Sequence, residues 1–179
     1  MQVKSDVQTI GIQYSWIPST LQNVDVYECT HLPKVIAFEA GTAQKFFKAA
    51  RVFANITLIT IPASVEVLCE RCFYECKSLS RVTFAAGSFL KRIEKEAFCW
   101  CESLKEIEIP ASVEVLCERC FGHILWGCCW SLSRVTFAAG SRLKRIEKEA
   151  FSECWSLEEI EIPASVEVLC EVALQVCKD

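Results

Sequence analysis

The chain has 179 residues, of which 52% are hydrophobic and 23% are charged, and its net charge is −4. This composition excludes intrinsic disorder, and the length fits a single domain. The sequence has no concentrated basic face and no apolar run long enough to span a bilayer. We therefore expect neither nucleic-acid binding nor membrane insertion.

The first part of the chain, residues 1–58, is predicted to form degenerate coils of a repeating structure. Phe38–Thr42 (FEAGT) is similar to Phe84–Ser88 (FAAGS), and Ile17-Pro18 matches Ile61-Pro62. The N-terminus lacks the charged start and apolar stretch of a signal peptide. This pattern predicts a cytoplasmic location, and the alternative is the cell surface if the chain is a fragment or a mature form.

Residues 59–171 repeat themselves and are predicted to form regular coils. Ile61–Phe73 (IPASVEVLCERCF) recurs letter for letter at Ile109–Phe121, and Ser78–Ser88 recurs at Ser131–Ser141. Self-similarity with a period of about 48 residues is typical of a solenoid. Each long repeat divides into two coils that carry the pattern L-x-x-[VI]-x-[IF]. Its alternating end predicts a short strand with one buried face, followed by a Pro-Ala-Ser or Ala-Ala-Gly-Ser turn.

The second half of each coil carries another apolar pair, followed by a small residue and phenylalanine. The spacing of three to four residues between Leu68, Cys72 and Cys76 predicts a short helical turn there. Residues 172–179 begin one more coil that stays incomplete, so the whole of 1–179 is a single solenoid. An apolar layer without a polar cap predicts self-association through the solenoid ends.

These motifs resemble those of the BspA-like leucine-rich repeat proteins. The resemblance covers about Ile17 to Cys177 and rests on I-P-x-S-V, then a small residue and Phe, then C-x-S-L. It implies a leucine-rich repeat solenoid with a short parallel β-strand ladder on one face, and short strands, turns and helical turns on the other. It also implies roles in adhesion and protein binding, often at the surface of microbes.

The 13 cysteines follow the repeat. Cys69-x-x-Cys72 and Cys117-x-x-Cys120 look like zinc half-sites, but they lie two coils apart, which is about 10 Å between stacked strands. One ion therefore cannot join the two pairs, and we interpret these cysteines as small buried apolar residues, with zinc or disulfides as alternatives. A reduced ladder is the favoured interpretation of the column Cys76, Cys101, Cys129 and Cys154.

No pattern in the sequence indicates catalysis. The two histidines, His31 and His123, have no signature of a nucleophile–base pair around them, and there is no phosphate-binding glycine loop. We therefore predict a protein that is not an enzyme and that needs no metal or cofactor.

Two surfaces are candidates for binding a protein partner. In a parallel ladder the outward residues Arg81, Glu106, Arg134 and Glu159 stack in one row of alternating sign, which is either a self-neutralised surface or a binding face. The face becomes acidic at Glu158, Glu159 and Glu161, where a partner with a basic patch would fit. An insertion between glycines carries Ile124, Leu125 and Trp126, which either fold back onto the solenoid or contact a partner.

The sequence therefore predicts a protein–protein interaction or scaffolding module. The alternatives are a cell-surface adhesin, or a fragment of one, that binds host or matrix proteins, and a structural component that assembles through its open ends.

Overall fold

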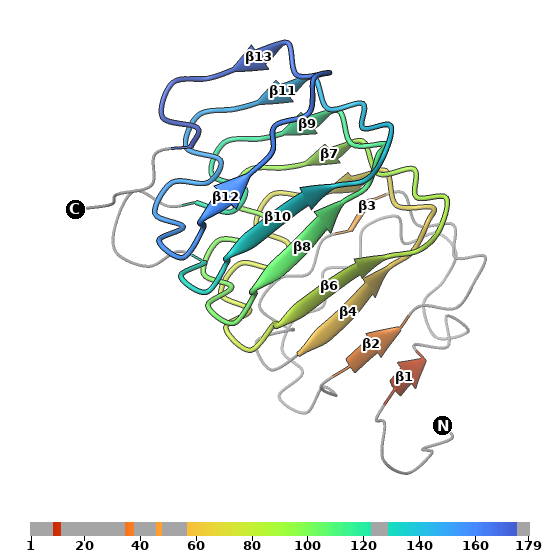
Figure 1. Cartoon of the computed structure of the whole chain (residues 1–179). Coiled ribbons are helices and arrows are strands. Elements are labelled where there is room, and N and C mark those ends of the chain that lie inside the picture. The colour runs from red at the N-terminus through yellow and green to blue at the C-terminus, as the bar shows by residue number, and fades with distance from the viewer. Residues whose placement is uncertain (1–8, 12–34, 38–45, 48–56, 123–128, 175–179) are drawn as a thin grey trace.

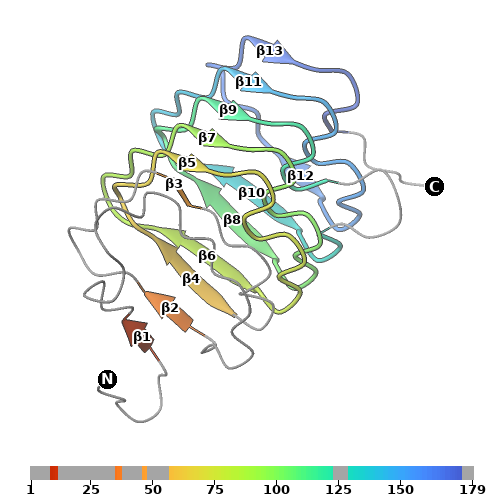
Figure 2. The ribbon, with the colours of Figure 1, turned by 180° about the vertical axis from the view of Figure 1, so that it is seen from behind.

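The computed structural model describes residues 9–11, 35–37, 46–47, 57–122 and 129–174. The chain winds into a parallel β-solenoid with two sheets on opposite sides, as Figures 1 and 2 show. This confirms the predicted fold class. In the described residues no helix is long and apolar enough to cross a membrane. The division into degenerate, regular and incomplete coils stays a prediction.

The larger sheet contains seven described strands, and neighbouring strands come from consecutive coils (Figure 1). In order they are β1 (Thr9–Gly11), β2 (Val35–Ala37), β4 (Leu58–Ile61), β6 (Arg81–Phe84), β8 (Glu106–Ile109), β10 (Arg134–Phe137) and β12 (Glu159–Ile160).

The smaller sheet lies behind the larger one and is best seen in Figure 2. Its six described strands are β3 (Phe46–Phe47), β5 (Val67–Leu68), β7 (Arg92–Ile93), β9 (Val115–Leu116), β11 (Arg145–Ile146) and β13 (Val168–Leu169).

Strand alternation places the core between the two sheets. In β6, Val82 is buried whereas Arg81 and Thr83 are exposed, and β8 and β10 repeat this pattern. Ile59 in β4 and Leu68 in β5 belong to opposite sheets of the same coil, and both side chains are completely buried. The L-x-x-[VI]-x-[IF] pattern therefore sends one side chain in two toward the core, as predicted.

A column of stacked phenylalanine rings occupies the side of the core that connects the smaller sheet back to the larger one. Phe73 and Phe98 have ring centroids 5.1 Å apart, and the rings of Phe98 and Phe121 are also 5.1 Å apart and nearly parallel. Phe151 continues the column at 5.3 Å from Phe121. All four rings are completely buried, so they tie consecutive coils together through dispersion and apolar burial.

The helical turn predicted around Leu68–Cys76 is not confirmed. The backbone there makes turns in which Cys72 N–H donates to Cys69 C=O and Tyr74 N–H donates to Arg71 C=O. The intervening N–H groups donate to the next coil, as Arg71 N–H does to Lys95 C=O at 3.0 Å. Left-handed backbone at Arg71, with φ of 57°, reorients the chain and prevents a continuous helical ladder.

Candidate functional site

The exposed side chains of the larger sheet form a continuous surface, which we call the outer strand face. Arg81 pairs in register with Glu106, and Arg134 lies between Glu106 and Glu159. The predicted row of alternating charge is therefore confirmed as a spatial arrangement. The polar residues on and beside these strands are exposed: Ser80, Arg81, Thr83, Lys105, Glu106, Glu108, Ser133, Arg134, Thr136, Glu158, Glu159 and Glu161.

Two open grooves cross the outer strand face. One, of about 760 Å³, lies over β6, β8 and β10 and is lined by Arg81, Glu106 and Arg134, among others. The second, of about 960 Å³, lies over β10 and β12, where Arg134 faces a group of three glutamates: Glu158, Glu159 and Glu161. The first groove thus carries both signs of charge and the second is mainly acidic. Such open, polar surfaces suit an extended partner better than a small enclosed molecule.

The second predicted surface is the insertion with Ile124, Leu125 and Trp126. These residues lie outside the described part of the chain, and their role stays a prediction. Next to the insertion, however, Trp130 is 50% exposed, and Trp155 in the following coil is 51% exposed. The sequence analysis missed both residues. The signal was present, because Trp130 and Trp155 stand where the earlier coils have Lys77 and Glu102.

Comparison with known protein families identifies the repeat from which this solenoid is built. The model of the BspA type leucine-rich repeat region matches residues 45–179 with six copies. The chain belongs to the BspA-type leucine-rich repeat family. Leucine-rich repeat proteins of this type are typically interaction and surface proteins, and the matched family is a repeat family rather than an enzyme family.

Solved structures with this repeat include the pneumococcal vaccine antigen PcpA, which is 26% identical with a TM-score of 0.51. That match covers 75% of this chain and 33% of the antigen, so the chain spans about a third of it. A leucine-rich cell surface protein from Faecalibacterium prausnitzii is 27% identical with a TM-score of 0.48, over 74% of this chain and 40% of that one. A comparison with curated protein sequences found no match.

Several cysteines of these BspA-type repeats are buried hydrogen-bond donors. The Cys101 thiol lies 3.2 Å from the carbonyl oxygen of Phe73, and the Cys129 thiol lies 3.1 Å from that of Phe98. Burial raises the pKa of Cys129 to about 12, so its thiol stays protonated and is a poor nucleophile. Of the four cysteines interpreted as buried, Cys72, Cys117 and Cys120 are buried, whereas Cys69 is partly exposed. In the described ranges, no group of three or more His, Cys, Asp or Glu residues is arranged to hold a metal.

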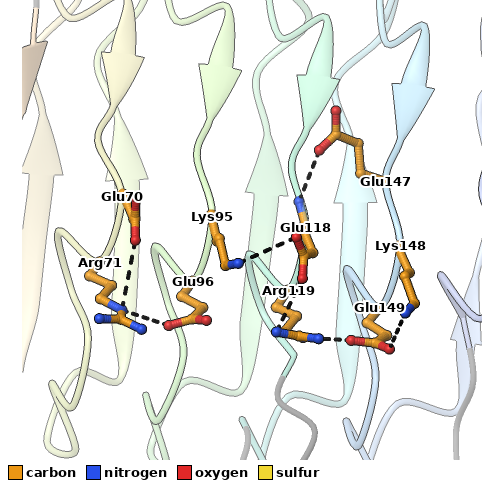
Figure 3. A network of polar contacts seen from close by, with 9 residues as sticks. All are labelled: Glu70, Arg71, Lys95, Glu96, Glu118, Arg119, Glu147, Lys148 and Glu149. Atoms are coloured by element: carbon orange, nitrogen blue, oxygen red, sulfur yellow. Dashed lines mark hydrogen bonds and ion pairs between the residues drawn. The ribbon is translucent and has the colours of Figure 1, made fainter.

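A second charged surface follows the turns after the smaller sheet, and we call it the charged edge. Figure 3 shows its central pairs, in which Arg71 binds Glu96 at 2.6 Å and Arg119 binds Glu149 at 2.5 Å. Lys95 reaches Glu118 in the next coil at 3.4 Å. Arg71, Glu96, Arg119 and Glu149 all have left-handed backbone, with φ between 54° and 58°. Because these charges pair between coils, we interpret the charged edge as structural rather than as a binding site.

The Arg119–Glu149 pair is expected to make the stability of the solenoid sensitive to acid. Burial alone raises the pKa of Glu149, but hydrogen bonds from Arg119 and Lys148 outweigh it and hold that pKa below its usual range. A depressed carboxyl pKa contributes stability above the unfolded pKa, and this contribution is lost as the pH falls through the folded pKa. At about pH 7 we expect Glu149→Gln to unfold at a lower urea concentration than the unchanged chain. At about pH 3 the difference between the two urea midpoints should become smaller.

The control for this prediction is Glu171→Gln, which changes an exposed carboxyl in the same region of the next coil. Its urea midpoint should follow that of the unchanged chain at both pH values. A gap for Glu149→Gln that stays constant with pH would contradict the assigned role of this ion pair.

Proposed function

We propose that this chain is a non-enzymatic protein-binding or scaffolding module that uses the outer strand face. The observation that carries the proposal is the pair of open grooves over β6 to β12, where exposed charged side chains stand in register along consecutive coils. A repeat solenoid presents such a surface on rigid strands. Binding a partner there does not require the solenoid to order a loop, which would cost free energy.

The acidic end of the face defines the preferred partner. Glu158, Glu159 and Glu161 are all exposed and line the same groove, with Arg134 at its border. Opposite charges across an interface raise the association rate and exclude partners of like charge. We therefore expect a partner with a basic patch to dock over β10 and β12.

A cell-surface adhesin is the second candidate function. It is favoured by two similar proteins, one described as a vaccine antigen and the other as a leucine-rich cell surface protein. Both roles use the same binding face, and they differ in location: a scaffold would be cytoplasmic, whereas an adhesin would bind host or matrix proteins outside the cell. Self-association through the solenoid ends also stays a prediction.

Selection from a random peptide display library tests the proposed face. We expect the enriched peptides to be basic, and to bind a Glu158→Lys/Glu161→Lys variant about tenfold more weakly than the unchanged chain, measured by fluorescence anisotropy. This variant leaves Glu159 in place beside Arg134. Affinity should also fall with added salt, because exposed charges are screened.

The matched control is Glu167→Lys/Glu171→Lys, which makes the same change in charge at two exposed residues near the smaller sheet. It should keep the affinity of the unchanged chain. If both variants lose affinity equally, the binding responds only to net charge and the outer strand face is not the site. Enrichment of acidic or neutral peptides would overturn the proposed partner chemistry.

A further inference from the structure

One column of surface positions carries charged residues in the earlier coils and tryptophans in the later ones. Cys76, Cys101, Cys129 and Cys154 occupy equivalent positions at the turn before successive strands of the larger sheet. Their thiols show this, because Cys101, Cys129 and Cys154 each approach the carbonyl oxygen of a phenylalanine one coil earlier. The residue that follows each cysteine therefore lies in the same surface column: Lys77, Glu102, Trp130 and Trp155.

Lys77 and Glu102, the first two members of this column, form an ion pair with each other. Lys77 Nζ lies 2.8 Å from a carboxylate oxygen of Glu102, and 5.5 Å from the ring centroid of Trp100. The ammonium group is thus held by a carboxylate and an indole face together. This contact within the solenoid is an example of a cation held jointly by a carboxylate and an aromatic ring.

The next two members expose their rings instead. Trp130 and Trp155 each leave about half of their surface open, at 50% and 51%. The neighbouring sequence is otherwise unchanged, because Ser131–Ser141 repeats Ser78–Ser88 letter for letter. Among the described residues the other large exposed apolar side chains are Phe89, Leu169 and Val172. None of these belongs to the column. The two tryptophans are therefore a local difference between coils whose neighbouring sequence is repeated.

The charges around Trp155 are negative. Trp155 Nε1–H donates to Glu153 Oε2 at 2.9 Å, which holds a carboxylate at the edge of the indole. Glu158 and Glu159 follow within four residues, and the segment 152–162 contains four glutamates and no lysine or arginine. An indole face with carboxylates beside it attracts a cation, and guanidinium groups suit such sites because they stack on rings and pair with carboxylates.

We propose that Trp130 and Trp155 form an aromatic docking site for a Lys/Arg-rich segment of a partner protein, which continues from there into the acidic groove of β10 and β12. An arginine or lysine of the partner stacks on these indoles in the way that Lys77 stacks on Trp100. This inference rests on the proposed function and adds to it the two residues that anchor the partner. Exposed tryptophans are strongly enriched among the residues that dominate binding energy.

The probe is an arginine- and lysine-rich peptide of about ten residues, compared with an acidic peptide of equal length by fluorescence anisotropy. A Trp130→Ala/Trp155→Ala variant should bind the basic peptide about tenfold more weakly. Trp130→Phe/Trp155→Phe should recover part of this loss, because phenylalanine keeps an aromatic face. The control Phe89→Ala removes a ring that is 64% exposed elsewhere on the solenoid, and it should bind as the unchanged chain does.

The outcomes separate this inference from the proposed function. If Glu158→Lys/Glu161→Lys weakens peptide binding and Trp130→Ala/Trp155→Ala does not, the aromatic site is wrong and the acidic face stands. If the unchanged chain binds basic and acidic peptides equally or neither of them, both proposals fail. Equal losses from Phe89→Ala and the double tryptophan variant would also overturn the site. Circular dichroism of each variant confirms that the comparison is made on folded chains.

Discussion

Replacing Phe98 with alanine is expected to lower the free energy of unfolding by about 3–5 kcal/mol. The Phe98 ring is completely buried and lies between the rings of Phe73 and Phe121, with centroids 5.1 Å from each. Truncation leaves a cavity in the middle of the column and removes two ring contacts at once. Because a coil of a solenoid contacts mainly its neighbours, the loss falls on both interfaces of this coil. Urea unfolding followed by circular dichroism measures it.

Phe89→Ala provides the control, because it makes the same substitution in the same coil at a ring that is 64% exposed. Its effect should stay within about 0.5 kcal/mol. Phe98→Leu should lose less than Phe98→Ala, since leucine fills more of the space. Similar midpoints for Phe98→Ala and Phe89→Ala would show that the phenylalanine column does not stabilise the stack.

The repetition in the sequence is what made the fold predictable. Once two copies are aligned, each alignment column becomes a row of residues in space, because the coils stack in parallel. The row Arg81, Glu106, Arg134 and Glu159 could therefore be derived without coordinates, and the strand register bears it out. The same reasoning identified the inward residues, since strand alternation needs only the local sequence.

The turns between the strands could not be derived in this way. An apolar spacing of three to four residues fits a helical turn, but it fits equally well a series of tight turns whose alternate N–H groups bind the next coil. Only the neighbouring coil decides between them, as in the bond from Phe73 N–H to Ala97 C=O at 2.8 Å. The left-handed backbone at Arg71 and Glu96 was equally hidden, because neither glycine nor asparagine marks it.

The candidate site was predictable in part. Alignment placed the acidic residues Glu158 and Glu161 on the outer strand face, and the structure shows both exposed, directly before and after β12. The grooves above that face depend on how the coils stack, which no single coil determines. Trp130 was overlooked because aromatic residues in an apolar sequence are usually assigned to the core, and only the structure shows how much of this ring is exposed.

Gly122→Ala is expected to destabilise the solenoid by about 3 kcal/mol, through overpacking rather than through loss of a contact. Gly122 is buried where two coils approach each other closely. A Cβ atom there would overlap the carbonyl oxygen of Glu149 and would lie 2.7 Å from the backbone nitrogen of Ser152. Both are backbone atoms, so no side-chain rotation relieves the overlap, and the coils must separate. Thermal and urea unfolding of the variant measure the loss.

The matched control is Gly140→Ala, which also adds a single methyl group. Gly140 has φ of +73°, and a Cβ atom there meets nothing within 4 Å, so its cost is only the strain of a left-handed residue, about 1–2 kcal/mol. A second test separates backbone from side-chain overlap. Adding Ser152→Gly to Gly122→Ala should restore no stability, because the contacting atoms of Ser152 belong to its backbone. Recovery of stability in that double variant would show instead that the two coils pack through side chains at this point.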